Sequence, residues 1–195
     1  LEANDLRPPA MAHDIIHGDV VFHLAAKVGG ILDNIAHPAD FIHDNLTIAL
    51  NVLRAAKDNR VKKIVSASSA CAYPQQLAVY EEGMMWAGYP EESNGAYGVS
   101  KRVLITLAEA YQKQHSLNIT TLIPTNMYGP GDCLDLARCH VIPAIIQKIH
   151  RAQTIGAGFV SMMGSGQARR DFLYVEDAAQ AFIDKTFVGV DFVPT

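Results

Sequence analysis

A tyrosine and a lysine four residues apart form the clearest catalytic pattern in this sequence. Tyr97 and Lys101 lie in a segment whose apolar residues follow helical spacing, so both side chains would share one helix face. A lysine ammonium stabilises a neighbouring phenolate, and we therefore expect the pKa of Tyr97 to fall below its usual value of about 10. Such a tyrosine could donate or accept a proton near neutral pH. The alternative is a surface tyrosine beside an unrelated lysine, because this spacing is common by chance.

A second set of polar side chains directly follows the apolar run at residues 61–67. Ser68 and Ser69 come first, and Cys71 stands two residues further on. A hydroxyl at the carboxyl end of a parallel strand faces the ligand cleft and could bind a substrate oxygen. A thiol in the same cleft could remove an acidic carbon-bound proton once its pKa is lowered. The alternatives are a serine-rich turn and a cysteine that packs as a small hydrophobic residue.

His140 is the candidate for a second acid or base. Inversion of a carbon needs one group that removes a proton and another that returns a proton to the opposite face. His140 stands at the start of a predicted helix, where the alternative is a capping or packed histidine. Cys133 and Cys139 lie nearby, but their spacing matches no common zinc pattern, so we expect no metal site.

Alternating strands and helices must position these residues. Strand-type apolar runs alternate with longer segments of helical spacing; the runs are 20–25, 61–67 and 119–124, and the helical segments are 40–58 and 96–115. This alternation predicts parallel βαβ units in an α/β fold, a Rossmann-like doubly wound sheet. Ligands of such sheets bind beyond the carboxyl ends of the strands, which is where the candidate residues stand.

The last third of the chain has a different pattern. We expect a helix, two short strands and a final helix, at residues 139–152, 159–163, 172–174 and 175–187. These elements would form a small C-terminal substrate lobe. We therefore divide the chain into a partial dinucleotide-binding domain at 1–130 and a partial substrate-binding lobe at 131–195 that is interleaved with it.

The composition excludes several classes of protein. The 195 residues are 49% hydrophobic and 18% charged, as in globular proteins, and the formal net charge is −4. An acidic chain lacks the basic surface that general nucleic-acid binding requires. No apolar run reaches the roughly 18–20 residues of a membrane span, and the charged start resembles no signal peptide. Three cysteines with no export signal predict free thiols and a cytoplasmic protein.

The order of these motifs resembles the extended short-chain dehydrogenase/reductase superfamily. The resemblance runs from about Val20 to Phe187 and includes His23–Ala26, Asn45 and Arg170–Phe172. It implies that Tyr97 is the acid/base, that Lys101 lowers the pKa of Tyr97, and that Ser69 binds the reacting oxygen. It also implies a nicotinamide cofactor along the backbone of Ala25 and Ala26. Sugar-nucleotide dehydratases of the superfamily carry Asp-Glu where this chain has Ala70 and Cys71, so dehydration is not expected.

Several further stretches resemble the GDP-L-fucose synthase family, which epimerises and reduces GDP-4-keto-6-deoxy-D-mannose. They are 26–31, 38–41, 124–130, 140–144 and 164–166. The resemblance implies epimerisation at C3 and C5 by Cys71 and His140, followed by reduction at C4. It places further cofactor and substrate contacts at four positions, namely Pro124, Asn126, Lys148 and Arg170. It also implies NADP, with NAD possible, a GDP-sugar or another nucleotide-sugar as substrate, and a homodimer built on the helices at 40–58 and 96–115.

Two other functions remain open. The Ser69–Ala70–Cys71 motif also resembles that of GDP-mannose 3,5-epimerase, which retains NAD for transient oxidation at C4. That family, however, uses lysine where this chain has His140. The third possibility is a non-catalytic nucleotide-binding protein. The strand, Gly-rich turn and helix that open a dinucleotide fold are absent from this sequence, so we expect either a fragment of a longer enzyme or a chain that does not bind the nucleotide.

Overall fold

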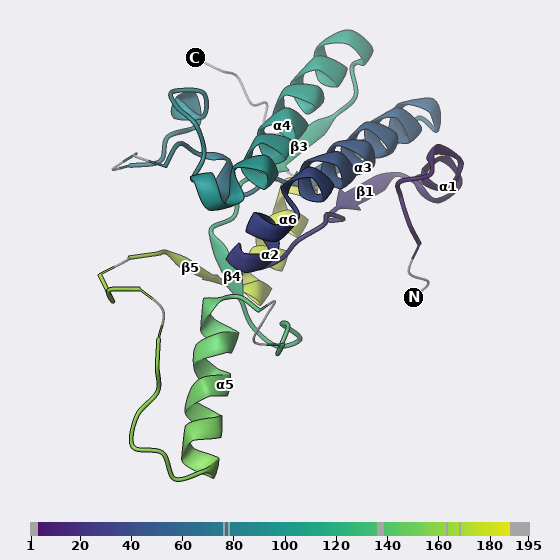
Figure 1. The fold of residues 1–195 in the computed structure, drawn as a ribbon. Coiled ribbons are helices and arrows are strands. Elements are labelled where there is room, and N and C mark those ends of the chain that lie inside the picture. The colour runs from purple at the N-terminus through teal and green to yellow at the C-terminus, as the bar shows by residue number, and fades with distance from the viewer. Residues whose placement is uncertain are drawn as a thin grey trace.

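A three-stranded parallel sheet lies at the centre of the fold (Figure 1). The computed structural model describes residues 4–75, 77, 79–135, 139–162, 164–167 and 169–187. The strands β1 (Val20–His23), β2 (Lys63–Ala67) and β3 (Ile119–Leu122) lie side by side in that order, and Ile64 pairs with both Val21 and Ile119. Because all three strands are parallel, their carboxyl ends meet at one edge. The predicted α/β class with a parallel sheet is confirmed.

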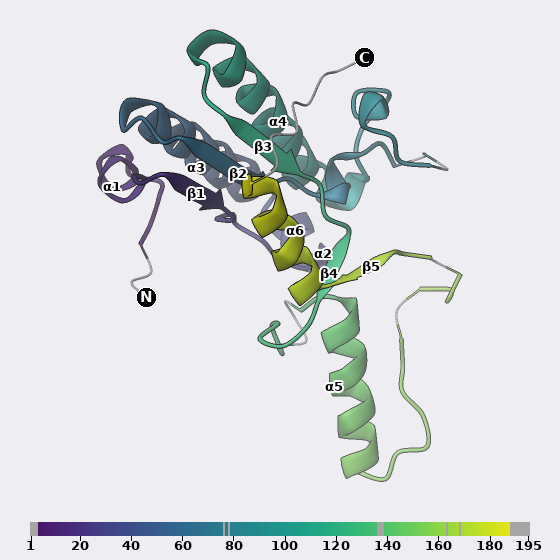
Figure 2. The same cartoon turned by 180° about the vertical axis from the view of Figure 1, so that it is seen from behind.

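Helices cover both faces of this sheet. The long helices α3 (Pro38–Asp58) and α4 (Gly95–His115) pack side by side on one face, and α6 (Val175–Phe187) contacts β2 on the other (Figures 1 and 2). Pro38 opens α3, where its fixed φ suits the first helical turn. The backbone leaves α4 at Ser116 in a left-handed conformation, with φ of 55°. Both helices begin and end within two residues of their predicted bounds.

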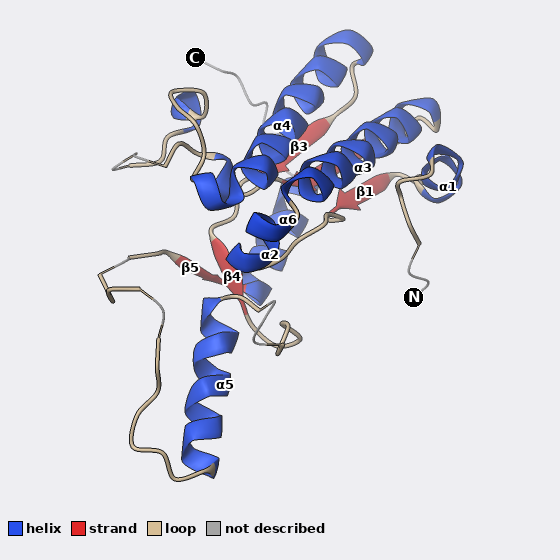
Figure 3. Ribbon diagram, in the orientation of Figure 1, coloured by secondary structure: helices blue, strands red, loops and turns tan. Residues whose placement is uncertain are grey.

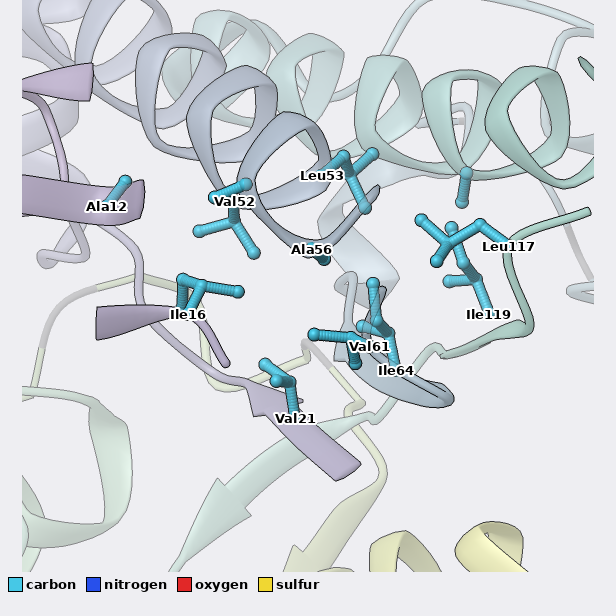
Figure 4. Packing of buried hydrophobic residues seen from close by; sticks show 12 residues of the cluster. Ala12, Ile16, Val21, Val52, Leu53, Ala56, Val61, Ile64, Leu117 and Ile119 are labelled. Carbon is cyan, nitrogen blue, oxygen red and sulfur yellow. The ribbon is translucent and has the colours of Figure 1, made fainter. Parts of the chain in front are cut away.

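The main hydrophobic core fills the space between α3 and the sheet (Figure 4). Val52 and Leu53 of α3 are fully buried there, against Ile64 of β2. The short helix α1 (Pro9–Ile15) contributes Ala12 from one side. Burial of each large aliphatic side chain stabilises the fold by roughly 1.5–3 kcal/mol relative to exposure. This packing fixes α3 and α4 relative to the strand ends where the candidate residues stand.

A second, two-stranded parallel sheet lies beside the first. It pairs β4 (Asn126–Tyr128) with β5 (Phe172–Tyr174), and α5 (Val141–Thr154) extends away from both sheets (Figure 3). The prediction contained β5, α5 and α6 but missed β4, which is only three residues long. The predicted strand at 159–163 is wrong for residues 159–162, which form a loop outside both sheets, and residue 163 lies outside the described residues.

Short elements connect the sheet to the helices near the candidate site. The helix α2 (Ile31–Ala36) follows β1, and three single turns of 3-10 helix lie between β2 and α4. These turns are η1 (Ala70–Ala72), η2 (Glu82–Met84) and η3 (Glu92–Asn94). None of the helices in the described part of the chain combines the length and apolar character needed to cross a membrane.

Candidate active site

Ser69 and Cys71 stand together immediately beyond the carboxyl end of β2. Ser69 has extended backbone and caps the turn η1, because its Oγ accepts a hydrogen bond from the backbone N–H of Cys71 at 3.2 Å. Serine is suited to this role because its short side chain reaches the free N–H groups of a helical turn. The cap fixes the direction in which the chain leaves the strand, so the hydroxyl and the thiol stay at the same edge of the sheet.

Lys101 joins α4 to this edge. Its Nζ donates a hydrogen bond to the carbonyl oxygen of Ala67, the last residue of β2, at 3.1 Å. In return the hydroxyl of Ser68 donates to the carbonyl oxygen of Lys101 at 3.1 Å. Lys101 is buried, and burial lowers the pKa of its ammonium to about 8. The helix therefore presents Tyr97, one turn earlier, to the edge where β2 ends.

The expected fall in the pKa of Tyr97 is wrong. The pKa of Tyr97 is raised to about 12, first by burial of the phenol and then by the thiol of Cys71, while a hydrogen bond with Ser69 lowers it in part. Lys101 Nζ lies 5.7 Å from the centre of the Tyr97 ring and is hydrogen-bonded to Ala67. Desolvation of the phenolate outweighs an ammonium at that distance, so Tyr97 is a protonated phenol at neutral pH.

Close packing of backbones brings Cys71 next to Tyr97. A β-carbon added at Gly98 would collide with the carbonyl oxygen of Cys71 and would lie 2.8 Å from the ring of Pro90. Glycine is therefore required at this position, because α4 and η1 touch through their main chains. The ring of Tyr97 also meets the ring of Phe41 edge-on, with centroids 6.3 Å apart. These contacts hold the phenol between α3, α4 and η1.

The loop after β1 is held by a buried asparagine of α3. Asn45 accepts a hydrogen bond from the N–H of Lys27 at 2.8 Å and donates to the carbonyl oxygens of Lys27 at 3.0 Å and Phe41 at 2.9 Å. This pairing fixes the path of the chain just after Ala25 and Ala26, the positions assigned to the cofactor. At the end of β1, burial and the charge of Lys101 lower the pKa of His23 to about 4.

His140 stands at the start of α5, whereas Cys71 lies in η1 beyond the end of β2. His140 is exposed, and its Nδ1 lies 3.8 Å from a carboxylate oxygen of Asp132. At this distance and exposure the pair contributes little to stability. The structure thus joins Ser69, Cys71, Tyr97 and Lys101 through contacts, and the pairing of Cys71 with His140 stays a prediction.

The remaining predicted contact residues lie along the second sheet and α5. Pro124 is half-buried, and its carbonyl oxygen accepts a hydrogen bond from the N–H of Ala70 at 3.2 Å, which ties the end of β3 to η1. Asn126 donates to the carbonyl oxygen of Asp171 at 3.1 Å. Lys148 donates to the carbonyl oxygen of Ser161 at 2.9 Å. Arg170 is exposed and lines a shallow depression beside β5.

Sequence reasoning gave no role to two buried polar residues beside the site. Asn45 is part of the resemblance only, because its hydrogen bonds depend on a loop 18 residues away. Arg102 follows Lys101 and stands four residues after Gly98, on the helix face that meets η1. A charged residue on that face was the available signal. Among the described residues, no three His, Cys, Asp or Glu side chains gather as a metal site requires.

Comparison with known proteins gives one family for nearly the whole chain. The model of the NAD dependent epimerase/dehydratase family matches residues 4–184. A GDP-L-fucose synthase from Sinorhizobium fredii is 42% identical over 165 residues, which are 84% of this chain and 52% of the relative. The GDP-L-fucose synthase of Escherichia coli is 40% identical over 169 residues, which are 85% of this chain and 52% of the relative. The chain thus spans about half the length of the curated relatives it matches.

A solved structure agrees with this assignment. The crystal structure of a GDP-L-fucose synthetase from Naegleria fowleri bound to NADP superposes with a TM-score of 0.85 and 33% sequence identity. The match covers 94% of this chain and 61% of that one. The Rossmann-like fold predicted from the alternating strands and helices is therefore confirmed. By the match of its sequence over residues 4–184 and by its fold, the chain belongs to the NAD dependent epimerase/dehydratase family.

Proposed function

We propose that this chain is part of an NADP-dependent epimerase and reductase that converts GDP-4-keto-6-deoxy-mannose to GDP-L-fucose. The proposal depends on one observation: contacts bring four side chains together at the carboxyl end of β2, namely Ser69, Cys71, Tyr97 and Lys101. A phenol, an ammonium and a hydroxyl suit reduction of a ketone, and the thiol adds a group for proton transfer at carbon. The relatives named GDP-L-fucose synthase support the choice of substrate.

The residues present fit a nicotinamide cofactor. The loop after β1 is pinned by Asn45, and the ammonium of Lys101 stands at the end of the adjacent strand β2. We propose that Ala25, Ala26 and Lys101 contact the cofactor, with Pro124 and Asn126 at the end of β3. Bound NADPH supplies the hydride for C4. We choose NADP over NAD because the similar structure from Naegleria fowleri contains NADP.

In the reduction, Tyr97 donates the proton. Its pKa of about 12 keeps the phenol protonated at neutral pH, so it can hydrogen-bond the ketone oxygen and then protonate the alkoxide as negative charge develops. The Ser69 hydroxyl, which already interacts with Tyr97, orients the same oxygen. Lys101 stabilises the phenolate that remains, because a charge 5.7 Å from the ring gains strength when water is excluded.

In the epimerisation, Cys71 and His140 exchange protons with the sugar. The 4-keto group acidifies the protons on C3 and C5, since the resulting carbanion is an enolate. One residue of the pair removes a proton and the other returns one to the opposite face. The histidine at position 140 favours this reading over a redox-neutral GDP-mannose 3,5-epimerase, whose second group is lysine. Lys148 and Arg170 are proposed to bind the nucleotide phosphates.

Three further features of the whole protein are part of the proposal. The partial dinucleotide-binding domain at 1–130 and the interleaved lobe at 131–195 are its two parts, and β4 pairs with β5 across that boundary. The protein forms a homodimer through α3 and α4, and Leu50, 47% exposed on α3, supports an apolar contact there. The enzyme acts in the cytoplasm. Sedimentation of the purified protein at several concentrations tests the dimer.

One incubation tests the activity. Purified protein is mixed with GDP-4-keto-6-deoxy-mannose and NADPH in deuterated water, and nicotinamide absorbance, product stereochemistry and deuterium at C3 and C5 are followed. We expect Cys71→Ser to impair deuterium exchange and Tyr97→Phe to abolish reduction while some exchange remains. Cys133→Ser is the matched thiol control and retains both. Equal loss of both activities in the two folded variants would contradict this division of roles.

A parallel incubation with GDP-mannose in place of the keto sugar separates the other two functions. A redox-neutral epimerase would exchange deuterium into GDP-mannose with no consumption of NADPH. A non-catalytic nucleotide-binding protein would bind GDP-sugar, detected by calorimetry, and would show neither exchange nor reduction.

A further inference from the structure

A buried arginine of α4 is hydrogen-bonded to the residue that follows the candidate thiol. Arg102 of α4 is 4% exposed, and burial lowers the pKa of its guanidinium. Its Nε donates to the carbonyl oxygen of Ala72, the residue after Cys71, and its Nη1 donates to the carbonyl oxygen of Gly88 at 2.8 Å. One side chain therefore holds both the turn η1 and the loop that follows η2 against α4.

The charge of Arg102 is compensated without a carboxylate. Within the part of the chain that the structure describes, Arg102 forms no ion pair, and its Nη2 has no hydrogen-bond partner. The ring of Trp86 covers the guanidinium instead, with its centre 5.4 Å from the Arg102 Cζ. Carbonyl dipoles and an aromatic face stabilise a buried cation less than a carboxylate does. A residue used only for packing would fill this space at lower cost as an apolar side chain.

One of the two carbonyl groups that Arg102 holds belongs to η1, the turn that contains Cys71, and the other belongs to the loop that leads to Pro90. Gly98, one turn before Arg102, meets the Cys71 carbonyl and Pro90 at contact distance, and Pro90 lies two residues after Gly88. The planar guanidinium donates in two directions at once, so it ties η1, through Ala72, and the Gly88 loop to α4. Tyr97 stands on the same helix, one residue before Gly98.

We propose that Arg102, covered by Trp86, is a positioning residue that holds Cys71 against Tyr97. The inference rests on the proposed function, in which Cys71 transfers protons at C3 and C5. Arg102 touches no reacting atom in this proposal; it acts through the Ala72 carbonyl.

The first test needs no turnover and measures access to the thiol. In a Cys133→Ser/Cys139→Ser background, the alkylation rate of Cys71 by iodoacetamide is followed against pH up to its plateau. At the plateau the thiol is fully ionised, so the rate reports access and not charge. We expect Arg102→Met to raise the plateau rate at least fivefold, because η1 loses its anchor. Arg102→Lys keeps the charge but reaches only one of the two carbonyl groups, so its plateau rate should lie between that of Arg102→Met and that of the parent.

A matched control and a second readout make the test decisive. Arg54→Met removes an arginine whose side chain is 78% exposed on α3, and it should leave the plateau rate unchanged. With substrate and NADPH, Arg102→Met should lower the ratio of deuterium exchange to reduction at least tenfold, which a general loss of folded protein would not change. A plateau rate within twofold of the parent, or an unchanged ratio, would overturn the proposal.

Failure of folding and failure of the proposed function give different results. If Arg102→Met does not fold, Arg102→Lys decides, and a plateau rate equal to the parent overturns the proposal. If Cys71→Ser leaves deuterium exchange intact, the proposed function fails, while the plateau rate still measures whether Arg102 anchors η1.

Discussion

Removal of the Asn45 side chain offers a quantitative test of the loop after β1. In Asn45→Ala the N–H and carbonyl of Lys27 lose their partner, and the carbonyl of Phe41 loses a donor. A net contribution of about 0.5–1.5 kcal/mol per hydrogen bond gives roughly 1.5–4.5 kcal/mol for three bonds. Lys27 is half-buried, so water replaces part of the loss. We therefore expect a fall of about 2–3 kcal/mol in the free energy of unfolding.

Urea unfolding at neutral pH, followed by circular dichroism, measures this change. Asn51→Ala is the matched control, since Asn51 also donates to backbone carbonyls from α3 but one of its two bonds is exposed. Asn45→Asp keeps the acceptor for the Lys27 N–H and loses both donors, so it should also destabilise the fold. The reasoning is refuted if Asn45→Ala costs no more than Asn51→Ala, or if Asn45→Asp is as stable as the parent.

Three further predictions follow from the buried groups. The pKa of His23 is about 4 in the folded chain and about 6.5 in the unfolded chain. Because unfolding takes up a proton between these pH values, the free energy of unfolding should fall by about 3 kcal/mol from pH 6.5 to pH 4. Urea unfolding of His23→Gln should lack this part of the acid sensitivity. Between pH 8 and pH 10.5 Lys101 is neutral in the folded chain and charged in the unfolded chain. The free energy of unfolding should therefore rise by about 3 kcal/mol across this range relative to Lys101→Met. An equal pH dependence of the two proteins would contradict the burial argument. Gly98→Ala should destabilise the chain by about 1–3 kcal/mol and raise alkylation of Cys71, whereas Gly83→Ala, with open space around it, should do neither in the same assays.

Much of the architecture could be predicted because its signals are local. The apolar runs at β1, β2 and β3 and the helical spacing of α3 and α4 lie within single segments, and all five elements form close to their predicted bounds. The prediction of a strand at 159–163 is wrong for residues 159–162 because a strand also needs a neighbouring strand to pair with. The residues of a segment do not reveal whether such a neighbour exists. The three-residue β4 was missed for the converse reason, since it is a strand only because β5 lies beside it.

The sequence alone determined which candidate groups lie close to one another along the chain. Ser69 stands two residues after β2, and Tyr97 and Lys101 are one helical turn apart on α4, so their order and spacing follow from the chain alone. Their position at the end of β2 depends on the hydrogen bond from Lys101 to Ala67, 34 residues away. Only the tertiary structure decided their chemistry. The rise in the pKa of Tyr97 depends on burial and on Cys71, and the anchor at Arg102 depends on the Ala72 carbonyl 30 residues away. Desolvation and hydrogen-bond partners come from whatever the fold packs around a group, and spacing along the chain does not encode them.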